Sequence, residues 1–249
     1  MFSNKISLSV AAVAASIFVA SAAQASFTAN ISSTGSAGSG GPVNLTAPVT
    51  PNTLQIGPTN VSINSPKSGG PQLFSITNFT ATSNSPSATN EAVEVGSSIQ
   101  IKNTSTSLET LTIHLTDDGF TAPTGSGLQA TAHGTLTWNP TDNPNSNDVV
   151  TAESVVNGNG VAGTSTSNTF SPGTSLSTYM PLASGNLGAL GSPYSLGSTL
   201  TVQLNGGDSV NVAWYSTVSA VPEPTAASLM GMGGLGALLL LGGRRKVKA

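Results

Sequence analysis

Clustered acidic side chains are the first candidates for chemistry in this chain. Asp117 and Asp118 stand together before Gly119, directly after an alternating apolar segment, and Asp142 and Asp148 lie in a second stretch rich in side-chain oxygen. Carboxylate and amide oxygens are the ligands that Ca²⁺ prefers in proteins. We interpret both stretches as solvated turns, with calcium binding as the alternative for each, and the second lacks the spacing of an EF-hand loop.

The residues that catalysis would need are sparse. His114 and His133 are the only histidines, and no G-x-S-x-G motif supports a serine nucleophile among the many serines. We interpret both histidines as surface or edge residues; His114 falls on the polar side of an expected strand, and His133 falls between strand-like pieces. Glu91 and Glu94 are three residues apart, so on a strand they point to opposite faces and do not form a glycosidase pair. The sequence predicts no catalytic residue and no cofactor.

A glycine motif near the C-terminus resembles a nucleotide loop only in its letters. Gly231, Gly233 and Gly236 match G-x-G-x-x-G. A dinucleotide site needs a preceding strand and an acid about 20 residues later, and neither is present. Gly233 and Ala237, four residues apart, instead suit the close approach of transmembrane helices.

The N-terminus has the three parts of a signal peptide. Lys5 supplies the positive charge, residues 6–20 are apolar, and Ala23 and Ala25 are the small residues of a cleavage site before Ser26. Residues 1–25 are therefore predicted to be a signal peptide that the Sec translocon exports and signal peptidase removes.

The C-terminal segment, 221–249, also has three parts. An extended Val-Pro-Glu-Pro stretch precedes residues 225–243, which carry no charge and approach the length that crosses a bilayer. Basic residues follow and should stay on the cytoplasmic side, which leaves the body of the chain outside. The motif residues are Pro222, Glu223 and Pro224, and the basic stop comprises Arg244, Arg245 and Lys246.

These three parts, in this order at the terminus, resemble the PEP-CTERM sorting signal of Gram-negative bacteria. The resemblance covers about the last 29 residues. It implies recognition by an exosortase in the inner membrane, removal of the tail, and delivery to the cell surface or extracellular matrix. Under this resemblance Pro222, Glu223 and Pro224 are recognised by another enzyme and catalyse nothing themselves.

Composition limits the partners and favours strands. Charged residues make up only 7% of the chain, Ser and Thr number 37 and 31, and cysteine is absent, which excludes disulfides and a thiol nucleophile. Between the two terminal segments lie two basic and nine acidic residues. Nucleic-acid binding needs clustered Lys and Arg, so we exclude it. Residues of these types favour extended structure over helix.

Period-two alternation predicts several half-buried strands in the body. Residues 110–116 place Leu111, Ile113 and Leu115 on one face, and residues 91–95, 98–101 and 134–138 show related patterns. Residues 198–219 alternate on both sides of Asn-Gly-Gly, which predicts a terminal β-hairpin.

We therefore expect an all-β fold, an antiparallel β-sandwich or a jelly-roll-like body, over residues 71–220. Residues 26–70 are less regular and are expected to form a loose N-terminal arm or the first strands. A signal peptide and a C-terminal transmembrane helix flank this body.

The function expected from the sequence is that of an exported, non-enzymatic surface or matrix protein, structural or adhesive, in contact with exopolysaccharide. Two alternatives stay open: a secreted hydrolase whose site the patterns miss, and a module that binds calcium or carbohydrate.

Overall fold

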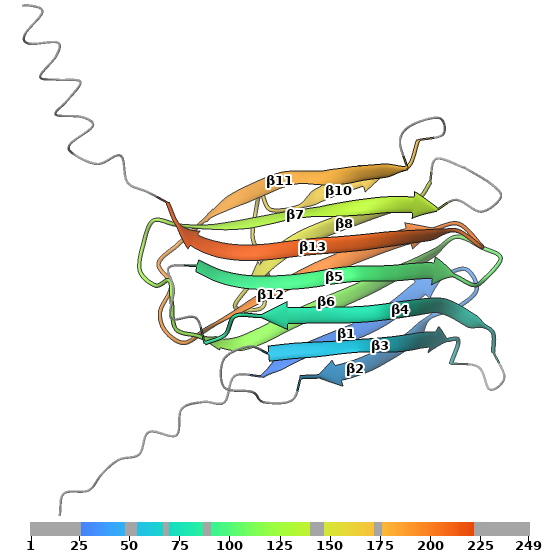
Figure 1. Cartoon of the computed structure of the whole chain (residues 1–249), viewed down its shortest axis with the longest axis horizontal. Helices are drawn as coiled ribbons and strands as arrows, with labels where there is room; N and C mark the ends of the chain where they lie inside the picture. The colour runs from blue at the N-terminus through green and yellow to red at the C-terminus, as the bar shows by residue number, and fades with distance from the viewer. Residues whose placement is uncertain are drawn as a thin grey trace, which may run out of the picture.

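The structure, a computed structural model, describes residues 26–47, 54–66, 70–86, 91–139, 147–171 and 176–221. Within these residues two antiparallel β-sheets pack face to face (Figure 1). The predicted all-β antiparallel sandwich is confirmed. None of these residues forms a helix that is long and apolar enough to cross a membrane. The predicted signal peptide and residues 222–249 lie outside the described residues.

The two sheets differ in size and strand order. Sheet A runs β10-β8-β12-β6-β1-β2, with β9 paired to β8, and sheet B, the nearer layer in Figure 1, runs β11-β7-β13-β5-β4-β3. Sheet A comprises β1 Phe27–Gly35, β2 Gly40–Thr46, β6 Glu109–Phe120, β8 Val149–Val156, β9 Asn159–Gly160, β10 Thr166–Thr169 and β12 Tyr194–Leu204. Sheet B comprises β3 Leu54–Asn64, β4 Gln72–Ser83, β5 Glu91–Asn103, β7 Leu128–Asn139, β11 Ser177–Leu187 and β13 Ser209–Ala220.

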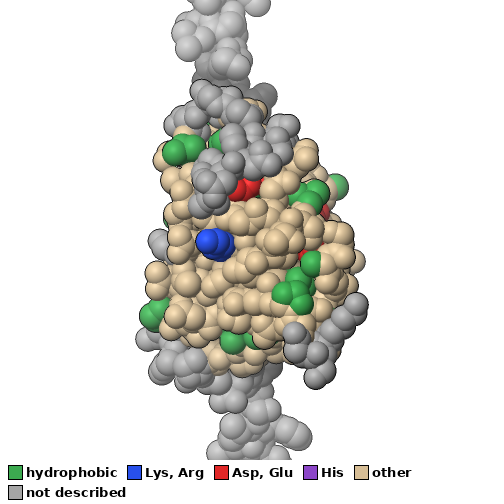
Figure 2. Space-filling model, turned by 90° about the vertical axis from the view of Figure 1, so that its right-hand side faces the viewer, with side chains coloured by type: hydrophobic (Ala, Val, Ile, Leu, Met, Phe, Trp, Pro, Cys, Tyr) green, Lys and Arg blue, Asp and Glu red, His purple; other side chains and the backbone are tan. Residues whose placement is uncertain are grey.

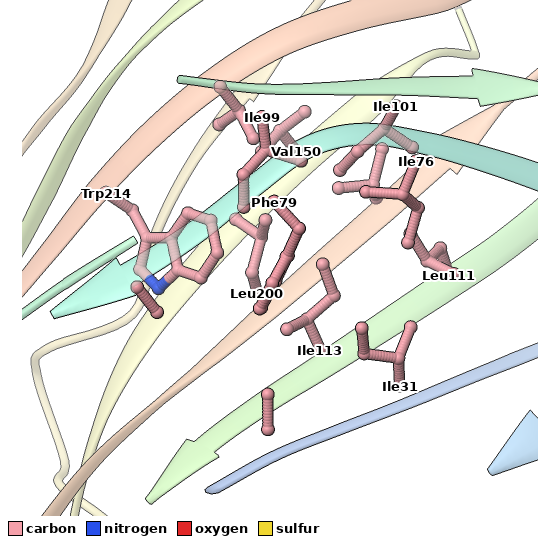
Figure 3. Close-up of a cluster of buried hydrophobic side chains, with 14 of the residues drawn as sticks. Ile31, Ile76, Phe79, Ile99, Ile101, Leu111, Ile113, Val150, Leu200 and Trp214 are labelled. Atoms are coloured by element: carbon pink, nitrogen blue, oxygen red, sulfur yellow. The ribbon is translucent and has the colours of Figure 1, made fainter. Parts of the chain in front are cut away.

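Alternation along each strand separates the core from the two outer faces. In β6, Leu111, Ile113 and Leu115 are buried, as the sequence predicts, while the residues between them are partly or fully exposed. The inward side chains of both sheets meet in one large apolar cluster, part of which Figure 3 shows around Trp214 and Phe79. Burial of these side chains is the main stabilising contribution to such a fold.

The N-terminal strands are part of the sandwich. Of the alternatives for residues 26–70, the structure shows strands: β1 pairs with β2 and β6 inside sheet A, and β3 forms an edge of sheet B. Phe27, Ala29 and Ile31 of β1 are buried. This segment looks irregular in the sequence because register shifts interrupt the alternation in β1 and β3, and because the polar Ser33 takes an inward position.

The predicted terminal hairpin is wrong. The two strands exist as β12 and β13, but β12 pairs with β6 and β8 in sheet A, while β13 pairs with β5 and β7 in sheet B. The loop between β12 and β13 is instead hydrogen-bonded to Asn103 at the end of β5. The Asn103 backbone N–H donates to the Asp208 carbonyl, and the Gly207 N–H donates to the Asn103 carbonyl, each at 3.0 Å. Alternation identifies the buried face of a strand but not its partner.

Candidate functional site

The structure separates the two adjacent acids, Asp117 and Asp118, that the sequence offered as calcium-ligand candidates. Asp117 and Asp118 lie within β6, so the interpretation of a turn after the strand is wrong. Asp117 is fully buried between the sheets, whereas Asp118 is exposed on the outer face and accepts a hydrogen bond from the Ser26 hydroxyl at 3.3 Å. Successive residues of a strand point to opposite faces, so these carboxylates cannot share one ligand.

The second acidic stretch is described only in part. Asp142 lies outside the described residues. Asp148 is buried beside Asp208, and its Oδ1 accepts hydrogen bonds from the backbone and side-chain amides of Asn205 at 2.8 and 2.9 Å. Burial, together with the neighbouring Asp208 carboxyl, raises the pKa of Asp148 to about 6, and the hydrogen bonds from Asn205 oppose the rise.

The two histidines lie on opposite outer faces of the sandwich. His114 is exposed on sheet A, and its Nδ1 lies 2.9 Å from the Thr199 hydroxyl, as expected for a surface residue. His133 lies within β7 of sheet B and not between strands. Its ring stacks on that of Tyr215 in β13, with centroids 4.8 Å apart and planes within 6°.

Strand register explains why these two rings meet. Tyr215 is the direct cross-strand partner of His133 on one side and of Val95 on the other. Directly opposite side chains in an antiparallel pair share a face, with Cβ atoms about 5 Å apart. The stack is therefore fixed by the sheet and forms a flat, half-buried platform on the outer face of sheet B.

A third ring lies in the next row of this face. Tyr179 of β11 pairs with Thr135 of β7, which pairs with Ala213 of β13, and the Tyr179 side chain is 67% exposed. Tyr179 is two strand spacings and a shift of two residues away from Tyr215, which corresponds to roughly 12 Å.

Shallow hollows flank these rings. One, of about 140 Å³, is lined by residues of β7 and β13 that include Thr135, Thr137, Asn211 and Ala213. Another of the same volume lies between β4 and β5 and is lined by Thr82, Ser83, Asn84, Val93 and Val95. We call Tyr179, His133, Tyr215 and the side chains around the first hollow the ring face.

The interior contains a polar belt that sequence patterns did not reveal. Ser83, Glu94 and Ser216 follow one another across sheet B in direct register, and Ser154 and Ser198 are partners in sheet A. All five are buried. One hint was present in the sequence of β5: Glu94 lies on the same inward face of the strand as the apolar Ala92 and Ile99.

Hydrogen bonds join this belt across the two sheets. The Ser198 hydroxyl donates to Glu94 Oε1 at 2.5 Å and accepts from Trp214 Nε1 at 2.8 Å. The Ser154 hydroxyl lies 2.7 Å from that of Ser216, which in turn lies 3.0 Å from the Gly197 carbonyl.

Glu94 and Asp117, which lie between the sheets, both have a raised pKa. Burial raises the pKa of Glu94 to about 8, the Ser198 hydrogen bond opposes the rise, and the Asp117 charge adds to it. Burial raises the pKa of Asp117 to about 7, with the Ser83 hydroxyl opposing the rise. As predicted, Glu91 and Glu94 point to opposite faces, and it is Glu94 that points inward.

The described residues bring together no three His, Asp or Glu side chains that could hold a metal ion. The sorting residues Pro222, Glu223 and Pro224, the basic stop and the cleavage residues Ala23 and Ala25 lie outside the described part.

Comparisons with known proteins find solved structures of weak similarity and no family. No family model matches, and no curated protein matches. A solved carbohydrate-binding module, TmCBM61 in complex with β-1,4-galactotriose, is 11% identical over 55% of this chain and 85% of its own, with a TM-score of 0.29. A carbohydrate-binding module described as belonging to the β-sandwich superfamily is 11% identical over 74% and 82%, with a TM-score of 0.30.

The C-terminal carbohydrate-binding module of the enzyme LamC from Zobellia galactanivorans is likewise 11% identical, over 66% of this chain and 98% of its own, with a TM-score of 0.26. Similarities this weak say nothing about the ligand of the chain. Its fold places it in the class of two-sheet antiparallel β-sandwiches.

Proposed function

We propose that this chain is an exported, non-enzymatic β-sandwich protein that binds polysaccharide outside the cell through the ring face of sheet B. The observation that carries the proposal is the stacked pair of His133 and Tyr215, with the exposed Tyr179 in the adjacent row beside a polar hollow.

The chemistry of this face suits a sugar chain. An aromatic ring offers a broad apolar surface for the C–H face of a sugar, and the tyrosine hydroxyl adds a polar end. Around the rings, Thr135, Thr137 and Asn211 provide donors and acceptors for sugar hydroxyls. The side chains that line the first hollow carry no charge, so an uncharged or weakly charged polysaccharide fits better than a strongly charged polymer. Figure 2, which faces one end of the sandwich and not the ring face, also shows few charged side chains.

The two terminal segments support export and sorting. The described strands begin at Phe27 in β1 and end at Ala220 in β13, so removal of either terminal segment would leave every described strand intact. The Sec system would export the chain, the apolar tail would hold it briefly in the inner membrane, and an exosortase would act at Pro222, Glu223 and Pro224 before surface or matrix delivery.

Binding is tested with the full chain in mild detergent, by glycan array and by affinity electrophoresis in gels that contain defined polysaccharides. Y215A and Y179A should each weaken binding about tenfold, because each removes roughly 1.4 kcal/mol of ring contact. H114A, which removes an exposed ring from the opposite sheet, is the matched control and should bind normally.

Two results would contradict this function. If every polysaccharide that retards the unaltered chain also retards Y215A and Y179A equally, the ring face is not the binding site. Release of new reducing ends from a bound polysaccharide would show that the protein is a hydrolase.

Sorting is tested separately by replacing Pro222, Glu223 and Pro224 with alanine. The altered chain should accumulate uncleaved in the inner-membrane fraction, because the exosortase would no longer recognise it. Unchanged processing and surface delivery would rule out the sorting proposal and leave the binding proposal intact.

A further inference from the structure

Four buried oxygen-bearing side chains gather between the sheets, at a place that polysaccharide binding does not use. They come from three strands and one loop: Ser83 at the end of β4, Ser85 just after it, Glu94 in β5 and Asp117 in β6. Their exposed fractions are 3%, 0%, 1% and 0%. We call these four side chains the interior oxygen cluster.

Register and packing hold the cluster together. Ser83 is the direct cross-strand partner of Glu94 in sheet B. Asp117 enters from sheet A, where its cross-strand partner Leu196 stands two residues before Ser198, the residue that donates to Glu94. The Ser83 and Ser85 hydroxyls both act on the Asp117 carboxyl. The cluster therefore bridges the two layers of the sandwich.

Several of these oxygens are unsatisfied. Among the described residues, neither oxygen of Asp117, nor Glu94 Oε2, nor the Ser85 hydroxyl has a hydrogen-bond partner of good geometry. The other Glu94 oxygen is occupied by Ser198. A buried polar atom without a partner costs about 1–3 kcal/mol, and a charged one costs more. The Ser85 hydroxyl matters separately, because it is neutral and fully buried, and it lies next to the acids.

No side-chain cation of the described residues balances these acids. Lys102 is the single Lys or Arg among them, and it lies exposed at the far end of β5. Eight residues of strand separate it from Glu94, which is about 25 Å.

We propose that the interior oxygen cluster is a Ca²⁺ site that ties the two sheets together. All four side chains offer only oxygen, which selects a hard cation, and two carboxylates balance a divalent charge. Mg²⁺ retains several of its waters, and these side chains are almost completely buried, so the larger and more readily dehydrated Ca²⁺ fits better. This site is independent of the polysaccharide proposal.

The test measures thermal unfolding of the full chain in detergent after treatment with EDTA and dialysis at pH 8. Addition of CaCl₂ to about a hundred times the dissociation constant should raise Tm by roughly 5–10 °C, because an ion that binds only the folded state stabilises it by mass action. MgCl₂ at the same concentration should have little effect. Equilibrium dialysis with radioactive calcium should show one ion bound per chain.

Matched variants locate the ion. D117N should lose both the bound calcium and the Tm shift, while D118N, which alters the neighbouring outward carboxylate, should retain both. If D117N does not fold, S85A removes one neutral ligand and should move the calcium titration to higher concentration. An unaltered chain that binds no calcium and gains no stability would overturn the proposal, and so would calcium binding that D117N and S85A leave unchanged.

Discussion

The contact between Trp214 and Gly96 gives the sharpest test of how the sandwich is packed. Trp214 in β13 is the direct partner of Gly96 in β5, and its indole is fully buried. A Cβ added at Gly96 would overlap three carbons of the indole ring. The Gly96→Ala substitution therefore forces a methyl group into the space that the ring occupies.

The size of the effect follows from how tightly the indole is held. Its Nε1 donates to the Ser198 hydroxyl at 2.8 Å, and the large apolar cluster surrounds the ring, so the indole cannot swing away. Overpacking of this kind costs about 1–3 kcal/mol. For a domain of this size, each kcal/mol lowers Tm by about 2–4 °C, so G96A should lose roughly 2–12 °C.

The assay is urea unfolding followed by circular dichroism. Gly188→Ala is the matched control, because a Cβ there has no atom within 4 Å. It should leave the free energy of unfolding within about 0.5 kcal/mol of its original value, as surface substitutions usually do.

A double-mutant cycle then decides whether the indole is the cause. In a Trp214→Leu background, the cost of G96A should shrink, because the atoms that it strikes are gone. If G96A costs no more than G188A, or costs as much without the indole as with it, then Trp214 does not lie over β5 and the proposed packing is wrong.

Three other changes have defined outcomes. The pKa of Asp148 is raised from 3.8 to about 6, so this carboxyl stabilises the fold fully below about pH 4 and loses that contribution as the pH rises through 6. The urea midpoint of D148N should therefore change less between pH 4 and 6 than that of the unaltered chain. Equal slopes in the two proteins would refute this. Ser216→Ala removes the hydroxyl beside the Gly197 carbonyl and should lower the free energy of unfolding by about 1 kcal/mol in the same assay. At Gly35 a Cβ would overlap the buried Glu109 carboxylate, so G35A should lower Tm by several degrees, and an unaltered Tm would show that this carboxylate lies elsewhere.

The sequence predicted the strands well, because side-chain period is a local property. Leu111, Ile113 and Leu115 alternate with polar residues, and that pattern alone identifies a strand with one buried face. The same rule correctly sent Glu91 and Glu94 to opposite faces. Scarce charge and abundant Ser and Thr also indicated, correctly, an all-β chain.

The candidate site was predicted less well, because it depends on partners far apart in the chain. The sequence singled out His133, but nothing local indicated that Tyr215 stacks on it or that Tyr179 lies in the next row. It also grouped Asp117 with Asp118, its neighbour in the chain, whereas the fold pairs Asp117 with Glu94, 23 residues earlier and in the other sheet.

The sequence by itself therefore determined the extended conformation and the buried face of most strands, both of which are written in short stretches of chain. Only the tertiary structure decided the partners: it placed β12 and β13 in different sheets and brought Glu94 and Asp117 together between them. The physical reason is that backbone hydrogen bonds are the same for every residue, so pairing depends on how all thirteen described strands pack at once.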